Sequence, residues 1–314
     1  MAVGVQVTPA PVIVLHIAGT GRSGSTLFGS LLGQLGDCFD VGELGYLWDR
    51  GLRQDGRCGC GSPVRTCPVW QPILREVFGP AGPSEAEVAR LAVLHRATAR
   101  GRDVATLWLR GRIQSESPEY RDILARLIRA AASVSGRRVV VDSTKPVSYG
   151  RLLDDLPGIE LRVIHLVRDP RAVAWSWLRH KPGTGADTMS TRPALTTAIM
   201  WNLGNLAAMG SWAGDPRRYL LIRYEDLIGD PARWLRAAAA LAGVDADELP
   251  LVGDSTVKMS PTHTVAGNVA RHQSGEIELR LDTEWSRALP RAQRVLVECA
   301  TYPLRNRYGY GRAR

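Results

Sequence analysis

Apolar residues in this chain gather into short, continuous runs, separated by turns rich in glycine, proline and polar residues. Four runs stand out for their β-branched residues and leucines: VIVLHIA at 12–18, RRVVVDS at 137–143, LRVIHLVR at 161–168 and RYLLIRYEDL at 218–227. A strand with one face in water alternates apolar and polar positions, whereas these runs predict strands covered on both faces, which is typical of parallel sheets. CFDV at 38–41 predicts a further short strand that ends near Glu43.

Helix-start signals follow most of these predicted strands. We expect a helix from about Ser25 to Leu35, directly after a glycine-rich turn. Elsewhere an aspartate or serine precedes a proline, which suits the N-cap and first turn of a helix, or a serine and a glutamate form a capping box. These signals are Asp169 with Pro170, Asp230 with Pro231 in a helix that ends at Gly243, Ser117 with Pro118, and Ser84 with Glu87.

The alternation of strands and helices predicts an α/β fold, a P-loop-like three-layer arrangement with a central parallel sheet and helices on both faces. The helices that begin near Ser84 and Ser117 predict a helical insertion at roughly 84–135, within a single domain at 1–314. Residues 48–83 are rich in glycine, proline and cysteine without a clear period, so we expect irregular surface structure there. In such a sheet, ligands bind beyond the carboxyl ends of the strands.

The longest N-terminal apolar run, Val12–Ala18, is too short to cross a bilayer and has no basic residues before it, so we expect a cytoplasmic protein without stable membrane insertion.

The amino-acid composition narrows the class of ligand. The formal net charge is +9, and all but three of the 40 lysines and arginines are arginine. Arginine suits bidentate contacts with anions, which favours an acidic small-molecule ligand. The arginines are scattered, so we expect no nucleic-acid partner; the oligomeric state stays open.

The turn GTGRSGST at 19–26 nearly fits two phosphate-binding patterns. Its three glycines match the dinucleotide pattern, with Asp40 or Glu43 at about the distance of the ribose-binding acid. The same turn follows the nucleoside-triphosphate loop, except that Ser25 replaces the lysine that neutralises the β- and γ-phosphates. The missing lysine argues against a kinase, although Val139–Asp142 resembles the magnesium-binding strand end that a kinase needs.

In a third interpretation, the ligand places a single phosphate at the turn and has little need for magnesium. Backbone N–H groups, hydroxyls and one arginine would hold that phosphate, and the positive end of the following helix would point at it. The candidate ligands are Gly21, Arg22, Ser23, Gly24, Ser25 and Thr26. A tight turn between a strand and a helix, with no ligand, is the alternative.

Two segments together resemble the sulfotransferases that use 3′-phosphoadenosine 5′-phosphosulfate (PAPS), in particular their bacterial branch. GRSGSTLFGSLL at 21–32 resembles the family's 5′-phosphosulfate loop, and VIHLVRDPRAVAWSWLR at 163–179 resembles its 3′-phosphate segment, in which Arg168 and Ser176 match the two phosphate ligands. Arg168 ends a predicted strand and Ser176 lies two turns into the next helix, so both can face one phosphate. A salt bridge to Asp169 or another acid is the alternative for Arg168.

The resemblance extends to further stretches. RYEDL at 223–227 resembles the strand end whose tyrosine, here Tyr224, lies against the adenine, with a core aromatic as the alternative. HTVAGNVARH at 263–272 resembles the C-terminal loop that closes over the nucleotide, although Val269 stands where relatives often carry proline. In that loop the resemblance assigns the 3′-phosphate side to Gly267, Asn268 and Arg271.

The resemblance implies an enzyme that moves a sulfuryl group in line from PAPS to a hydroxyl of a small-molecule acceptor, such as a specialised metabolite, glycolipid or carbohydrate. Lys145, just past the strand at 137–143, is the candidate cation for the oxygens that gain charge. Glu43 is the candidate general base, because it ends the strand expected next to the glycine turn and burial would raise its pKa. His180 and His263 compete for the role of base.

The alternative functions are a P-loop nucleotide kinase and a non-catalytic nucleotide-binding module on the same fold. Residues 180–205 mix a loop with an apolar helix that carries Trp201 and Asn202, and they predict a wall and lid on the acceptor side, with plain packing as the alternative.

Three closely spaced cysteines, Cys58, Cys60 and Cys67, lie in CGCGSPVRTCPVW, which resembles a cysteine-bearing segment common in the bacterial branch. They could form a structural turn, a disulfide or, with Cys38 as a fourth ligand, a zinc site. Structural zinc sites usually combine two spaced pairs of ligands, which this segment lacks, so we expect no metal requirement.

Overall fold

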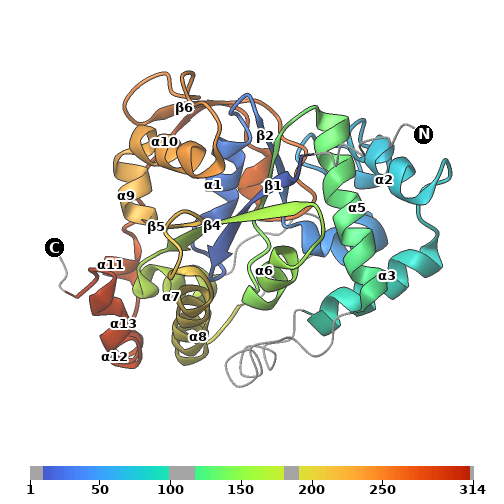
Figure 1. The fold of residues 1–314 in the computed structure, drawn as a ribbon. Helices are drawn as coiled ribbons and strands as arrows, with labels where there is room; N and C mark the ends of the chain where they lie inside the picture. Colours follow the sequence, from blue (N-terminus) through green and yellow to red (C-terminus); the bar gives the residue numbers. More distant parts are fainter. Residues whose placement is uncertain (1–9, 99–116, 180–190, 312–314) are drawn as a thin grey trace.

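The computed structural model describes residues 10–98, 117–179 and 191–311. Its centre is a five-stranded sheet in the order β2–β3–β1–β4–β5, in which all neighbouring strands are parallel (Figure 1). The strands are β1 (Val12–Gly19), β2 (Cys38–Gly42), β3 (Val139–Asp142), β4 (Ile159–Val167) and β5 (Tyr219–Arg223). The predicted runs all form strands, and the prediction of parallel pairing is confirmed.

The strand order differs in one respect from our expectation. We expected the strand that ends near Glu43 to lie beside the glycine turn after β1, but β3 lies between β1 and β2. The neighbours of β1 are therefore β3, which leads to Lys145, and β4, which leads to Arg168. Since the strands are parallel, the segments that follow them still meet at one edge of the sheet.

Helices cover both faces of the sheet, and β1 shows why. Leu15 and Ile17 pack into one core while Val14 and Ala18 pack into the other, so successive residues of one strand are buried on opposite faces. The first core is closed by α1 (Ser25–Leu32), α9 (Tyr224–Gly229) and α10 (Pro231–Ala242), and the second by α5 (Pro118–Ser135), α6 (Val147–Asp154) and α8 (Ala194–Trp212). The three-layer prediction is confirmed, although α1 ends at Leu32 rather than Leu35.

The helices predicted at 84–135 are α3 (Glu85–Thr98) and α5, and both lie between β2 and β3 in the chain. The capping box at the start of α3 is present: the Ser84 N–H donates to the Glu87 carboxylate at 2.8 Å, and the Glu87 N–H donates to the Ser84 hydroxyl at 3.3 Å. The Ser117 hydroxyl likewise accepts from the Tyr120 N–H at the start of α5. In Figure 1 both helices lie beside α2 at one end of the molecule.

The prediction of irregular surface structure at 48–83 is wrong. The segment contains most of a π-helix (Leu47–Arg53), a 3₁₀ turn (Val64–Thr66) and the amphipathic helix α2 (Trp70–Phe78). Trp48 and Trp70 are among the largest fully buried side chains, and they join the core that also holds α5. Glycine and proline mark the turns in this segment, but its aromatic and aliphatic side chains face inward.

The remaining elements complete the C-terminal part. β6 (Thr256–Met259) and β7 (Gly275–Glu278) pair antiparallel, and the segment between them includes a 3₁₀ turn (Val269–His272). Next to α7 (Pro170–Leu178) and α8 lie the three last helices, α11 (Trp285–Ala288), α12 (Arg291–Ala300) and α13 (Tyr302–Arg307) (Figure 1). Among the residues that the structure describes, no helix is both long and apolar enough to cross a membrane.

Candidate active site

A cleft of about 1430 Å³ opens where the carboxyl ends of the strands meet. It brings together residues from stretches that lie far apart in the sequence. From the predicted set, the lining includes Gly21, Arg22, Gly24, Ser25, Thr26, Glu43, Lys145, Arg168, Ser176, Tyr224, Gly267, Asn268 and Arg271. The glycine turn and the segment with Arg168 and Ser176 therefore face one cavity.

The glycine turn after β1 needs glycine at positions where a side chain would clash with its neighbours. Gly24, the N-cap of α1, has a φ of 95°, and a Cβ there would lie 2.3 Å from Cδ2 of Tyr224. A Cβ on Gly21 would lie 2.8 Å from Cζ2 of Trp177. Ser23 is the member of the predicted loop that does not line the cleft: it is buried, and its hydroxyl has no hydrogen-bond partner in the described part of the chain. The turn thus packs tightly against the aromatic side chains of Trp177 and Tyr224.

Arg168 connects the two predicted phosphate-binding segments, the glycine turn and the start of α7. One of its guanidinium nitrogens donates to the Arg22 carbonyl in the glycine turn at 3.2 Å, and the guanidinium carbon stands 4.7 Å from the centre of the Tyr224 ring. The other terminal nitrogen lies 3.6 Å from the Asp282 carboxylate. The predicted alternative, a salt bridge with Asp169 or another acid, is therefore present with Asp282, while Asp169 pairs with Arg171 at 2.6 Å.

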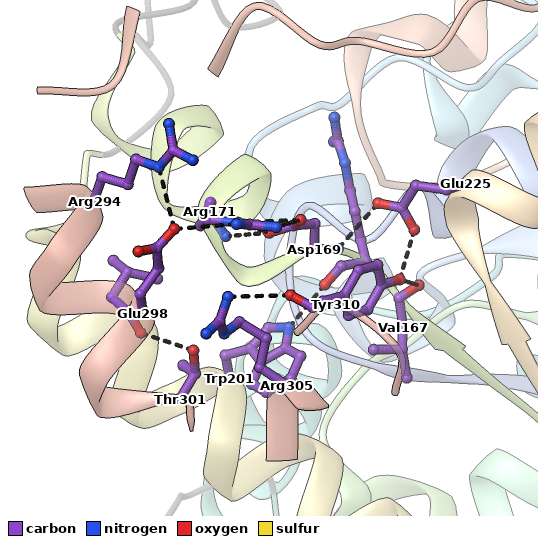
Figure 2. A network of polar contacts seen from close by, with 12 residues as sticks. Val167, Asp169, Arg171, Trp201, Glu225, Arg294, Glu298, Thr301, Arg305 and Tyr310 are labelled. Carbon is purple, nitrogen blue, oxygen red and sulfur yellow. Dashed lines mark hydrogen bonds and ion pairs between the residues drawn. The ribbon is translucent and has the colours of Figure 1, made fainter. Parts of the chain in front are cut away.

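A polar network behind this segment fixes the backbone on both sides of Arg168 (Figure 2). The indole N–H of Trp201 donates to the Arg168 carbonyl at 2.9 Å. The Glu225 carboxylate accepts from the Asp169 N–H at 3.0 Å and from the Tyr310 hydroxyl at 2.5 Å. Figure 2 also shows Arg171 between the carboxylates of Asp169 and Glu298. Since each of these groups is held by a partner, the direction in which Arg168 leaves the strand is set by α8, α9 and the C-terminal helices.

The C-terminal loop closes the other side of the cleft. The backbone of Glu43 donates to the Ala266 carbonyl at 3.2 Å, which seats the loop against the end of β2. Gly267 has a φ of 144°, and the Asn268 N–H donates to the Thr26 hydroxyl at the start of α1 at 3.1 Å. Arg271 donates to the Gly267 carbonyl at 3.0 Å, so its guanidinium folds back across its own loop.

Glu43 and Lys145 form an ion pair inside the cleft, and Arg50 lies 3.3 Å from the second carboxylate oxygen. Burial alone would raise the pKa of Glu43, as we expected. However, Lys145, Arg50 and Arg271 outweigh burial and hold that pKa below its ordinary value. The expectation of a raised pKa is therefore wrong, because the sequence did not reveal how many cations surround this carboxylate.

The sequence of this chain also matches that of a known protein family. A family model described as "Sulfotransferase family" matches residues 15–248, which is well over half of the chain. The chain belongs to the sulfotransferase family. The predicted resemblance is confirmed.

Two curated relatives are carbohydrate sulfotransferase 2 of mouse and of human, each 26% identical over 288 residues. The alignment covers 74% of this chain but only 53% of either relative, so the chain spans about half the length of the curated relatives it matches. Among solved structures, the sulfotransferase domain of the Synechococcus PCC 7002 olefin synthase has a TM-score of 0.51 at 22% identity, covering 94% of this chain and 97% of that one. The sulfotransferase domain from the curacin biosynthetic pathway has the same TM-score and coverage at 19% identity. The structural likeness confirms the P-loop-like fold.

Two acids proposed for other nucleotide folds lie away from the cleft of this sulfotransferase. Asp40 is buried, accepts from the Gly42 N–H at 2.9 Å and does not line the cleft, so it cannot serve as a ribose-binding acid. Asp142 is fully buried and accepts from the Thr144 N–H and the Tyr149 hydroxyl, both at 2.7 Å. A carboxylate enclosed in this way is not available to a magnesium ion, which removes the main support for the kinase interpretation.

Of the two competing bases, only His263 is among the described residues. His180 falls outside the described residues. His263 points its Nδ1 at Cys67, 3.3 Å from the sulfur, and does not line the cleft. Cys38, the predicted fourth ligand of the cysteine group, begins β2 and packs into the core under α1 instead.

Sequence reasoning missed several residues that line the cleft. Trp177 follows Ser176 directly, and its ring lies between the guanidiniums of Arg22 and Arg192, 4.6 and 4.1 Å from its centre. The other cleft residues that were missed include Tyr46, Arg50 and Arg280. Trp177 could have been found as the direct neighbour of the predicted ligand Ser176, but Arg50 was hidden in the segment interpreted as irregular.

The acceptor side is only partly as predicted. Residues 180–190 lie outside the described residues, and α8 contributes Met200 and Leu203 to the cleft. Trp201 is buried against Arg168, and Asn202 donates to the Ala300 carbonyl at 2.7 Å. The packing alternative therefore holds for Trp201 and Asn202.

Proposed function

We propose that this protein transfers a sulfuryl group from PAPS to a hydroxyl of a small-molecule acceptor. The observation that carries the proposal is that two anion-binding elements, the glycine turn and the segment with Arg168 and Ser176, line one cleft and touch through the bond from Arg168 to the Arg22 carbonyl. A donor with one anionic group at each end of an adenosine fits such a pair. An enzyme that needs only one phosphate site would not require both.

The chemistry of the lining fits this nucleotide. In the part of the chain that the structure describes, two acids, Glu43 and Glu278, line the cleft against seven cations, which are Arg22, Arg50, Lys145, Arg168, Arg192, Arg271 and Arg280. The unpartnered Ser23 hydroxyl lies in the turn where a 5′-phosphosulfate would be held. Tyr224, packed against Gly24, offers the aromatic face on which an adenine would stack. The nucleotide would thus be held mainly by arginines, backbone N–H groups and one aromatic ring.

Bound PAPS would supply a sulfuryl group that is ready to leave its phosphate. Lys145 stands beside the glycine turn and would place its positive charge next to the oxygens that gain negative charge as the bond to the leaving phosphate breaks. Glu43, ionised because of its cationic neighbours, would accept the proton of the attacking hydroxyl. Because Lys145 pairs with Glu43 in the structure, moving Lys145 toward the donor would free the carboxylate and restore part of its basicity.

The acceptor would enter past Tyr46, Met200 and Leu203, which line the cleft on the side of Glu43 and α8. Met200 and Leu203 are 44% and 49% exposed, so the mouth of the cleft offers apolar surface. A hydroxyl-bearing acceptor with an apolar portion suits this entrance. The mammalian relatives are carbohydrate sulfotransferases by name, which makes a glycolipid a reasonable first acceptor class to test.

The test measures ligand binding and turnover separately. Adenosine 3′,5′-bisphosphate without magnesium should raise the melting temperature, whereas AMP should do so much less and Mg-ATP should add nothing. Labelled sulfate from PAPS should then appear on members of a panel of glycolipids, sugars and phenols. Stabilisation by Mg-ATP alone would instead indicate the kinase, and tight bisphosphate binding without transfer to any acceptor would indicate the non-catalytic module.

A further inference from the structure

Four potential metal ligands meet outside the active-site cleft. They are Cys58, Cys60 and Cys67, from the segment between the π-helix and α2, and His263, about 200 positions later in the chain. One ligand atom from each lies within 4.8 Å of all the others. Cys58 and Cys67 are buried, while Cys60 and His263 are partly exposed, so the group sits just beneath the surface.

The distances fit a tetrahedral metal centre better than a disulfide. The sulfur of Cys67 lies 3.5 Å from that of Cys58 and 3.8 Å from that of Cys60. The Nδ1 of His263 lies 3.3 Å from the Cys67 sulfur and 3.8 Å from the Cys58 sulfur. Around a tetrahedral zinc with bonds of about 2.3 Å to sulfur and about 2.0 Å to nitrogen, neighbouring ligand atoms are roughly 3.5–3.8 Å apart. A disulfide needs about 2.05 Å between its sulfurs, and none of the cysteines is disulfide-bonded.

The surroundings also suit thiolates. The backbone N–H groups of Val69 and Trp70 lie near the Cys67 sulfur, and the Cys60 N–H lies near the Cys58 sulfur. Such N–H donors stabilise negative sulfur and orient it toward a metal. The backbone of His263 is held as well, because the indole N–H of Trp70 donates to its carbonyl at 2.5 Å. The backbone around Cys58, Cys67 and His263 therefore supports these three ligands before any ion binds.

We propose that Cys58, Cys60, Cys67 and His263 form a structural zinc site. Binding would replace the thiol protons by bonds to Zn²⁺ and release those protons to water, leaving the zinc with three thiolates and one neutral imidazole. All four positions of the tetrahedron are taken by protein, and none of the four ligands lines the active-site cleft, so the ion has no open position for chemistry.

The zinc would clamp two loops that already touch. The Gly59 N–H donates to the Thr264 carbonyl, and Arg271 donates to the Arg57 carbonyl, both at 3.0 Å. His263 lies four residues before Gly267, at the root of the loop that closes the cleft. Fixing His263 to the cysteine segment would hold this root in place. The cysteine segment by itself lacks the second pair of ligands that structural zinc sites usually have. In the folded chain His263 supplies the fourth ligand, in place of the expected Cys38.

The first experiment measures zinc in the full chain purified without chelator from zinc-supplemented cells. We expect about one zinc per chain, and cobalt added to chelator-treated protein should give the visible absorption of a tetrahedral thiolate site. Chelation should lower the melting temperature, and added zinc should restore it. Chelation should also speed amide hydrogen exchange in residues 262–272, which the zinc would hold in place, more than in β1.

Substitutions identify the ligands. Cys60→Ser, at the least buried sulfur, and His263→Asn should each reduce zinc content at least tenfold, while Cys299→Ser, which changes an exposed cysteine on α12, should leave it unchanged. Wild-type protein that contains no zinc and has the same melting temperature with and without added zinc would overturn the proposal. A Cys58–Cys67 disulfide in protein purified under reducing conditions, visible as the loss of two hydrogen masses, would overturn it as well. Because cobalt spectra use wild-type protein, a variant that misfolds does not weaken the test.

Discussion

The ammonium group of Lys145 contacts the carboxylate of Glu43 across the ends of the neighbouring strands β3 and β2. The two residues are 102 positions apart in the chain, and only the parallel pairing of these strands brings them together. The contact helps to keep Glu43 ionised at neutral pH, because Lys145 lowers the pKa of its carboxyl group. The carboxylate that we propose as the base and the cation that we propose beside the donor are thereby held in one place.

Replacing Glu43 tests the role of this carboxylate as the base. Glu43→Gln keeps the size of the side chain but cannot accept a proton, so turnover should fall by about 10²–10⁴-fold. The affinity for adenosine 3′,5′-bisphosphate should change little, because Glu43 itself carries a negative charge and is not a phosphate ligand. Steady-state kinetics and titration calorimetry separate the two quantities. Glu119→Gln, at an exposed residue on α5, is the control; weaker binding with unchanged turnover at saturation would refute the role.

Arg168 should distinguish nucleotides by their 3′-phosphate. Arg168→Ala removes a charged hydrogen-bond donor, which contributes about 1.5–3 kcal/mol, so the affinity for adenosine 3′,5′-bisphosphate should fall by roughly 10- to 100-fold. AMP has no 3′-phosphate, and its weaker binding should change much less. Thermal shift titrations without magnesium give both affinities. Arg217→Ala, at a surface pair with Asp215, controls for loss of charge, and equal losses for both nucleotides would make Arg168 a purely structural residue.

Local sequence patterns predicted the strands and the helix caps, because each of these features is determined by a few neighbouring residues. The run before Gly19 is apolar at consecutive positions, and it forms β1 as a strand buried on both sides. The strand order is not encoded locally: nothing near Glu43 reveals that β3, almost 100 residues later, separates it from β1. The cations around Glu43 also come from distant segments, which is why its pKa was predicted in the wrong direction.

The cysteine segment shows the same limit. Its glycines and prolines correctly indicate turns, but whether the side chains between them are buried depends on α5, which covers them in the folded chain. The nearness of His263 to Cys67 depends on the loop after β6 returning past β2. Residue spacing alone could therefore suggest a metal but not supply its fourth ligand.

A substitution at Gly24 should damage the glycine turn in two ways. Gly24→Ala places a side chain at φ 95° and drives its Cβ into the Tyr224 ring. Gly136→Ala is the matched control, because Gly136 has a φ of 64° but nothing within 4 Å of the added Cβ. The control should lose about 1–2 kcal/mol of stability from strain alone. Gly24→Ala should lose more in urea denaturation and also bind adenosine 3′,5′-bisphosphate at least tenfold more weakly; equal behaviour of the two variants would contradict the clash.

Asp40 should give the protein a pH-dependent stability. Burial raises the pKa of Asp40 to about 7, although the Gly42 N–H and the Ser30 hydroxyl oppose the shift. The unfolded chain releases this proton near pH 4, so between about pH 4 and pH 7 the folded state binds more protons and stability falls as the pH rises. The loss is complete above the folded pKa.

Asp40→Asn removes this titration. The free energy of unfolding of the variant, relative to wild type, should therefore increase from pH 4 to pH 7, by at most roughly 1.4 kcal/mol per pH unit, and then stay level. Burial lowers the pKa of His16 and His165 to about 4, which acts in the opposite direction, but both proteins share these groups and they cancel in the difference. Urea denaturation across this pH range measures it. Asp245→Asn, at an exposed position, is the control, and a difference for Asp40→Asn that does not change with pH would show that Asp40 is already ionised in the folded protein.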